Sequence, residues 1–227
     1  MKNHINNQNI KGILFDVDGT LYYQTPLRLI MILNLFLSNF WRPKELKGLI
    51  KIISTYRWAQ EQLRKNNISD GNNAQQQLIL TVKKTGISTD KIAKTISEWF
   101  EKKPLKFIRL CRRFGLKRTL IKLQSSGYKL GIFSDYPAKE KLSSLGVINF
   151  FSTIVSAYHD EIHGFKPNTN GFIVAAEKMK LQPSEILYIG DRDEVDGVGA
   201  TNAGMHVQMV GLTSKIPLQE IGIFLKF

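Results

Sequence analysis

The stretch GILFDVDGTL, residues 12–21, begins as a buried β-strand would and ends in a turn that carries two carboxylates. Its apolar part, Gly12–Phe15, has the length of a buried strand, and Gly19 favours a tight turn directly afterwards. Asp16 and Asp18 therefore stand at the carboxyl end of the predicted strand. Two carboxylates this close can take different catalytic roles. One can serve as nucleophile or metal ligand, and the other as proton donor and acceptor. Backbone N–H groups of the same turn can surround an anion.

The second half of the chain alternates between strand-like and helix-like patterns. Strands are predicted at 128–133, 153–155, 185–189 and 206–210, and helices at 119–125, 138–145, 170–179 and 195–203. This alternation predicts an α/β fold with a doubly wound, mostly parallel, Rossmann-like sheet that has helices on both faces. Ligands of such sheets bind at the carboxyl ends of the strands.

Residues 22–107 lack this alternation and are predicted to be helical. Apolar residues recur there at helical spacing, for example at Leu46, Leu49, Ile50 and Ile53. Polar breaks divide the segment into about four helices, and they fall at 42–43, 66–73 and 86–90. We therefore predict a helical domain at 22–107, inserted into a discontinuous α/β core made of residues 1–21 and 108–227.

The chain is strongly basic, with a net charge of +13, and residues 22–107 hold fifteen Lys and Arg against six Asp and Glu. A basic surface favours anionic partners, such as nucleic acid, anionic lipid or phosphorylated metabolites, and charge alone does not choose among them. The sequence has one cysteine, Cys111, and shows no apolar signal-peptide segment at its start. A reducing, cytoplasmic setting is therefore expected.

The most apolar stretch is LRLIMILNLFLSNFW, residues 27–41. It is too short for a typical membrane-spanning helix, and polar residues interrupt it. We expect a helix buried in the protein. The alternative is a surface that touches lipid or a partner.

Three predicted strands end in polar side chains, and a fourth polar cluster follows the strand at 153–155. The clusters are Asp16 with Asp18, Ser134 with Asp135, Asp191 with its neighbours, and GFKP at 164–167. In a parallel sheet all four can meet at one edge. Lys166 is a compact cation able to bind a phosphate and hold its charge in the transition state. Asp191 offers hard oxygen ligands, which suit Mg²⁺ better than zinc.

In order and spacing, four motifs of this chain resemble those of the haloacid dehalogenase (HAD) superfamily of aspartate-nucleophile phosphatases. The motifs are DVDGTL at 16–21, FSD at 133–135, GFKP at 164–167 and GDRDEVDGVGA at 190–200. The resemblance covers the core, and the insertion at 22–107 resembles the helical cap that many members carry. Nothing in the cap sequence names a substrate.

The resemblance implies a mechanism in which Asp16 attacks the phosphorus of a phosphate ester and forms an aspartyl-phosphate. Asp18 then protonates the leaving oxygen and later activates the hydrolytic water. Lys166 completes the catalytic set by holding phosphoryl oxygens in the transition state. Because a dianionic phosphate meets a carboxylate only with a cation between them, this chemistry agrees with a Mg²⁺ cofactor.

The same resemblance assigns the phosphate and metal ligands. Ser134, the backbone N–H of Asp135 and Lys166 would bind the phosphate, together with Thr20 of the first turn. Many relatives have Asn at position 135, and the charge of Asp135 is unfavourable near a phosphate unless its side chain points away. The metal would lie between the Asp16 carboxylate, the Asp18 backbone carbonyl and Asp191.

The stretch IGDRDEVDGVGA, residues 189–200, holds four carboxylates within six residues. Asp191 follows the predicted strand and is the proposed metal ligand. The last motif of the family has a second acidic residue four or five positions later, which selects Asp196 as a supporting residue. Asp193 and Glu194 are expected to face solvent, and Asp193 is the alternative should Asp196 point away.

We therefore expect a Mg²⁺-dependent phosphomonoester hydrolase that acts on a small phosphorylated metabolite. One alternative is a phosphotransferase, such as a sugar-phosphate mutase, built on the same site. Another is a regulatory protein whose basic cap binds nucleic acid or a membrane, although no motif supports either partner. The basic cap would suit an anionic substrate, and Tyr22, Tyr23 and Gln24 could line the cavity or serve as hinge and packing residues. The sequence does not fix the oligomeric state, and a monomer is compatible with it.

Overall fold

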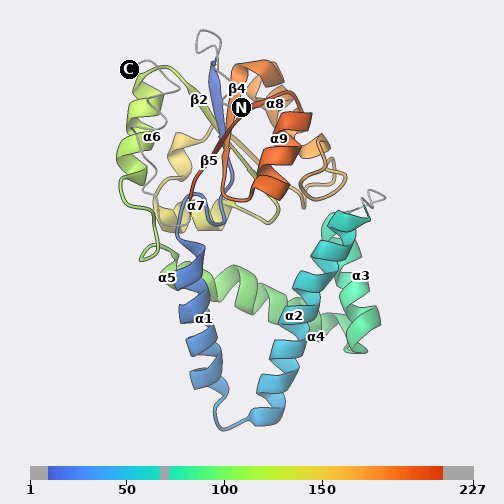
Figure 1. Cartoon of the computed structure of the whole chain (residues 1–227). Helices are drawn as coiled ribbons and strands as arrows, with labels where there is room; N and C mark the ends of the chain where they lie inside the picture. The colour runs from blue at the N-terminus through green and yellow to red at the C-terminus, as the bar shows by residue number, and fades with distance from the viewer. Residues whose placement is uncertain (1–9, 67–71, 212–227) are drawn as a thin grey trace.

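The computed structural model describes residues 10–66 and 72–211, and within them it contains a five-stranded, all-parallel sheet (Figure 1). The strand order is β3-β2-β1-β4-β5. The strands are β1 (Gly12–Phe15), β2 (Lys129–Ser134), β3 (Thr153–Ser156), β4 (Ile186–Gly190) and β5 (His206–Met209). The prediction of a doubly wound α/β core is therefore confirmed.

Helices cover both faces of this sheet, which explains the fully buried apolar runs of β1 and β4. On one face, Ile13 and Phe15 pack with leucines of α6 (Leu116–Ser125) and α7 (Lys139–Leu145). On the other face, Leu14 packs with residues of α8 (Asn170–Met179) and α9 (Val198–Asn202). Successive side chains of a strand point to opposite faces, so β1 contributes to two separate cores. Short helical turns complete the core domain at Ile148–Phe150, Pro183–Glu185 and Asp193–Gly197.

The segment between β1 and α6 is helical. It consists of α1 (Gln24–Asn39), α2 (Pro43–Lys65), α3 (Asn73–Thr85), α4 (Thr89–Ile96), a π-helical segment at Ser97–Lys102, and α5 (Lys103–Ile108). A small core of its own forms where Ile52 and Tyr56 of α2 meet Ile92 and Ile96 of α4. Figure 1 shows these helices on the side of the sheet where β1 leads into α1. We call this segment the cap, and its division from the core as a domain stays a prediction.

Helix α1 does not bury its apolar residues as expected. Only Leu27, Leu35 and Asn39 are buried along it. The side chains of Leu29, Ile32, Leu33, Phe36, Leu37, Phe40 and Trp41 are exposed, the last to 88%. The expectation of a buried helix is therefore wrong for most of the stretch 27–41. Among the described residues, no helix combines the length and hydropathy that crossing a membrane requires.

Candidate active site

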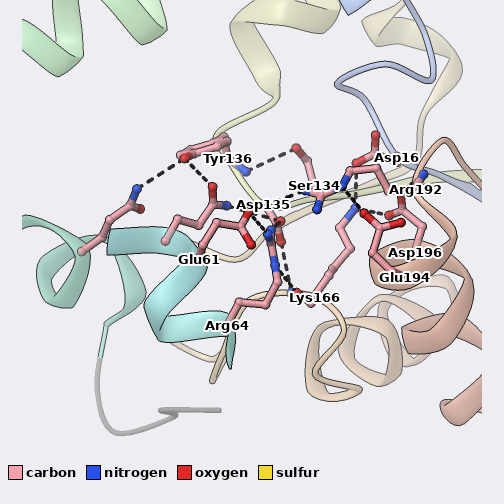
Figure 2. Close-up of polar contacts among 12 residues, drawn as sticks. Asp16, Glu61, Arg64, Ser134, Asp135, Tyr136, Lys166, Arg192, Glu194 and Asp196 are labelled. Atoms are coloured by element: carbon pink, nitrogen blue, oxygen red, sulfur yellow. Dashed lines mark hydrogen bonds and ion pairs between the residues drawn. The ribbon is translucent and has the colours of Figure 1, made fainter. Parts of the chain in front are cut away.

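The carboxyl ends of the central strands bring the predicted site residues together. Asp16 follows β1, and Lys166 reaches the same point from the loop after β3, as Figure 2 shows. Asp191 follows β4. The Lys166 Nζ atom lies 2.6 Å from Asp16 Oδ1 and 2.8 Å from Asp196 Oδ1. It also bonds to the Tyr188 hydroxyl at 2.9 Å, and that hydroxyl donates to Asp196 at the same distance. One buried ammonium group therefore joins two carboxylates that are 180 positions apart in sequence.

Burial and neighbouring charges shift the pKa values of these site residues. Burial alone would lower the pKa of Lys166, but Asp16 and Asp196 outweigh it and hold the pKa well above its usual value. The pKa of Asp16 is raised, first by burial and further by the nearby carboxylates, although Lys166 opposes the rise. Burial and then Asp196 raise the pKa of Asp191 to about 6. The cluster thus holds more negative charge than its single lysine neutralises.

This excess of carboxylates fits a divalent cation. One carboxylate oxygen from each of Asp16, Asp191 and Asp196 lies within 4.8 Å of the others. Three carboxylate oxygens form a hard donor set of the kind that Mg²⁺ prefers. A Cβ atom added at Gly19 would overlap the Asp191 carboxylate, so the turn after β1 closes directly on the same cluster. The residues present therefore fit a magnesium site.

The side chain of Asp18 is held apart from this cluster. Its two carboxylate oxygens lie 2.7 and 2.6 Å from Lys141 Nζ, and Tyr22 donates its hydroxyl to Oδ1. Burial raises the pKa of Asp18, but Lys141 outweighs it and lowers the pKa below the usual value. Lys141 and Tyr22 therefore stabilise the ionised form of Asp18, which is the form that can accept a proton. Sequence reasoning missed Lys141, because nothing in the local pattern separates it from other helix lysines.

The residues expected to bind phosphate differ in their surroundings. Ser134 is buried at the end of β2, and its Oγ accepts a hydrogen bond from the backbone N–H of Tyr136 at 3.3 Å. Thr20 is fully buried, and its hydroxyl has no hydrogen-bond partner among the described residues. Asp135 turns its carboxylate away from Asp16 and toward α2 of the cap, as Figure 2 shows.

An arginine of the cap binds the Asp135 carboxylate. Arg64 donates from Nη2 to Asp135 Oδ2 at 2.6 Å and from Nε to the Lys166 carbonyl at 2.6 Å. Asp135 Oδ1 also accepts the backbone N–H of Lys166 at 3.2 Å. Gln60 adds a second link, since the Tyr136 hydroxyl donates to it at 2.8 Å. Arg64 therefore ties the cap to two loops of the core, a contact that no local sequence signal indicated.

The four carboxylates after β4 divide between the site and solvent. Asp196 is buried, and its Oδ2 accepts the backbone N–H of Arg192 at 3.1 Å. Asp193 and Glu194 are exposed, and Glu194 pairs with the Arg192 side chain at 2.9 Å. Asp191 is half-buried and belongs to the metal-binding cluster. The arrangement agrees with the expected placement, while the roles of these residues stay predictions.

A cavity of about 360 Å³ opens above the carboxylates and extends beneath the cap. Its core wall includes Asp16, Asp18 and Lys166, and the cap supplies side chains from α1, α2 and the segment at 97–105. Of the three residues that could line the cavity or serve as hinge and packing residues, Tyr22 and Gln24 line it, whereas Tyr23 is not among the lining residues described. A volume of this size suits a small ligand.

Comparison with known protein sequences supports the family resemblance of the four motifs. The family model described as haloacid dehalogenase-like hydrolase matches residues 13–210. A glyceraldehyde 3-phosphate phosphatase of Methanopyrus kandleri is 32% identical over 86% of this chain and 82% of its own length. A phosphoglycolate phosphatase of Salmonella typhi is 24% identical over 91% of this chain and 82% of its own length.

Solved structures show the same fold. A HAD phosphatase from Thermococcus onnurineus matches with a TM-score of 0.57 at 18% identity, covering 96% of this chain and all of its own. A β-phosphoglucomutase from Clostridium difficile matches with a TM-score of 0.61 at 16% identity, covering 95% and 96%. Because the family model spans residues 13–210 and a named phosphatase is 32% identical over most of both chains, the chain belongs to the haloacid dehalogenase-like hydrolases, among their phosphatases.

Proposed function

We propose that this protein is a Mg²⁺-dependent phosphomonoester hydrolase that works through an aspartyl-phosphate on Asp16. The observation that carries the proposal is the junction of Asp16, Lys166 and the carboxylates of Asp191 and Asp196 at one end of a capped cavity. Asp18 stands beside this junction with its own cation, Lys141. Phosphoryl transfer needs such positioning and charge stabilisation more than it needs covalent chemistry from many groups.

The reaction we propose has two steps. A carboxylate oxygen of Asp16 forms a bond to phosphorus while the bond between phosphorus and the leaving oxygen breaks. Asp18 enters this step protonated, gives its proton to the leaving oxygen and becomes the carboxylate that Lys141 stabilises. Water then attacks the phosphorus of the aspartyl-phosphate, Asp18 accepts a proton from it, and Asp16 is released with inorganic phosphate. Lys166 holds its charge beside Asp16 throughout, and Ser134 lies at the end of the adjacent strand, where its hydroxyl can bind a phosphoryl oxygen.

Asp16 and Asp191 would hold the metal ion, with the backbone carbonyl of Asp18 as the third ligand that the family resemblance implies. Asp196 would support the site by fixing Lys166. A bound Mg²⁺ supplies the positive charge that lets an anionic phosphate approach the Asp16 carboxylate. The cap would exclude water from the cavity when substrate is bound and would open to release product.

The substrate we propose is a small phosphorylated metabolite. The cavity is of modest size, and the two relatives described above are named for small phosphate esters, glyceraldehyde 3-phosphate and phosphoglycolate. We place the protein in the cytoplasm, because its one cysteine is a free, buried thiol that suits a reducing compartment.

Turnover of an aryl phosphate with and without Mg²⁺ tests this function. Asp16→Asn should abolish phosphate release while circular dichroism shows an intact fold, and Glu194→Gln, which changes an exposed carboxylate of the same region, should retain it. Hydrolysis by a folded Asp16→Asn protein would rule out Asp16 as the nucleophile. Slow loss of the aspartyl-phosphate, with turnover of a bisphosphorylated sugar, would instead favour a phosphotransferase.

A further inference from the structure

Two arginines of the cap line the cavity and have no carboxylate partner among the described residues. Other cations of the cavity wall are paired: Lys166 with Asp16 and Asp196, Lys141 with Asp18, Arg64 with Asp135 and Glu61, and Arg192 with Glu61 and Glu194. Arg28 of α1 and Arg57 of α2 line the same cavity. Neither forms a salt bridge with any residue of 10–66 or 72–211.

The aromatic side of the cavity holds Arg57 in place. Its guanidinium carbon lies 5.2 Å from the centre of the Phe100 ring. That ring in turn contacts Tyr56 and Tyr136, with ring centres 5.6 and 6.2 Å away. An aromatic face attracts a cation without cancelling its charge. Arg57 is therefore positioned by rings and keeps its charge available to a ligand.

Arg28 and Arg57 also act on each other. The pKa of Arg57 is lowered first by burial and then by repulsion from Arg28, while Tyr136, Asp18 and Tyr22 oppose the shift. Both arginines line the cavity that Asp18 also lines, and each lies within range of the other's charge. Arginine stays protonated in proteins, so this repulsion is relieved by binding an anion rather than by losing a proton.

The phosphoryl group of the substrate does not need this pair. In the proposed function, Lys166, Ser134 and the metal ion account for the phosphoryl end, beside Asp16. The arginines line the cap side of the cavity, where the proposed function would place the part of the substrate that leaves. Guanidinium groups match carboxylates and phosphates because two parallel N–H groups meet two oxygens.

We propose that Arg28 and Arg57 form a second anion site, which selects phosphomonoesters carrying a carboxylate or a second phosphate on the leaving group. This inference rests on the proposed function, because it assumes that the reacting phosphate lies beside Asp16. Phosphate esters with an uncharged leaving group then bind more weakly, since they leave two cap guanidinium groups unneutralised.

Binding of phosphonates, which cannot be hydrolysed, tests the site without relying on turnover. Isothermal titration calorimetry with Mg²⁺ present would compare phosphonoacetate, methylenebisphosphonate and ethylphosphonate, which share one phosphoryl-like group and differ in the second group. We expect the wild-type protein to bind a doubly anionic probe at least roughly tenfold more tightly than ethylphosphonate. The first two probes separate a carboxylate from a second phosphate as the preferred group.

The variants are Arg28→Gln, Arg57→Gln, the double variant, and Arg57→Lys, which keeps the charge but not the planar fork. The double variant should lose the tenfold preference, and Arg57→Lys should keep part of it. Lys47→Gln is the matched control, because Lys47 is an exposed cation of α2 outside the cavity wall. It should leave the preference unchanged.

Two results would overturn the proposal: equal binding of the three probes by the wild-type protein, or an unchanged preference in the folded double variant. If the Gln variants at position 57 fail to fold, Arg28→Gln and the charge-keeping Arg57→Lys still decide the question. Hydrolysis of an aryl phosphate by the wild-type protein, and its loss in Asp16→Asn, is a separate readout. The anion site can therefore fail while the phosphatase function stands.

Discussion

Replacing Arg64 should weaken the link between cap and core. The Arg64 side chain is only 8% exposed, and it pairs at 2.6 Å with Asp135, which is 14% exposed. Burial alone would lower the pKa of Arg64, but Asp135 and Glu61 outweigh burial and raise it. Its Nε also supplies a hydrogen bond to the Lys166 carbonyl at 2.6 Å. Arg64→Met would remove the cation and leave both core acceptors short of a donor.

The burial of the Arg64–Asp135 pair determines how much unfolding free energy we expect the variant to lose. Removing one member of a fully buried ion pair costs about 3–5 kcal/mol, whereas exposed pairs contribute about 0–1 kcal/mol. Asp135 keeps two weaker donors, the backbone N–H of Lys166 at 3.2 Å and Gln60 at 3.4 Å. We therefore expect Arg64→Met to lower the free energy of unfolding by about 2–3 kcal/mol.

A double-mutant cycle with Asp135→Asn, followed by urea unfolding, isolates the pair itself. The coupling energy between the two positions should exceed about 1 kcal/mol, because each side chain depends on the other. Arg42→Met is the matched control, since Arg42 pairs with Glu45 at 3.4 Å and both side chains are at least 60% exposed. Its loss should stay below about 1 kcal/mol. A coupling energy under about 0.5 kcal/mol for Arg64 and Asp135 would refute the claim that this bridge holds the cap to the core.

Three further predictions concern the turn after β1 and the metal site. Mg²⁺ should raise the melting temperature, and at a concentration one hundred times its Kd the gain in unfolding free energy should be about 2.7 kcal/mol. Asp191→Asn should lose most of this gain. An equal gain in that variant would count against the metal site. Gly19→Ala should destabilise the protein by about 1–2 kcal/mol in urea unfolding, because its φ is +94° and its Cβ would overlap the Asp191 carboxylate. Its control, Gly48→Ala within α2, meets open space and should stabilise the protein by about 0.5–1 kcal/mol, so equal effects would contradict the argument. Thr20→Val should not lower stability in the same assay, because the Thr20 hydroxyl is buried and has no hydrogen-bond partner in residues 10–66 and 72–211. A loss above about 1 kcal/mol would reveal a partner, and lost activity alone would support a phosphate-binding role.

The core could be predicted well from the sequence because buried parallel strands have a recognisable residue pattern. A strand that is buried on both faces is continuously apolar, and the polar residue that follows it marks its carboxyl end. The fully buried runs of β1 and β4 are examples. Since all such ends lie at one edge, the meeting of Asp16, Asp191 and Lys166 could be expected from chain order alone.

Side-chain contacts between elements far apart in the sequence, from the cap or within the core, could not be predicted in this way. Arg64 and Lys141 look like any other basic residue of an amphipathic helix, and only the packing of distant elements brings them to Asp135 and Asp18. Tyr188 was hidden within an apolar strand, where its hydroxyl nonetheless joins the lysine cluster. For α1, apolar content was taken as burial, yet content alone does not supply a neighbouring surface to pack against.

The cap determines the direction in which the charged side chain of Asp135 points. On sequence grounds, Asp in place of the usual Asn was unfavourable near a phosphate unless the side chain pointed away. It does so, because Arg64 draws the carboxylate toward α2 while the backbone N–H of Lys166 binds its other oxygen. If the cap moved off, Asp135 would lose its cation and stand as an unpaired anion next to the phosphate site. Binding of an anionic substrate should therefore favour the closed cap, and Asp135→Asn should make substrate affinity less dependent on Arg64.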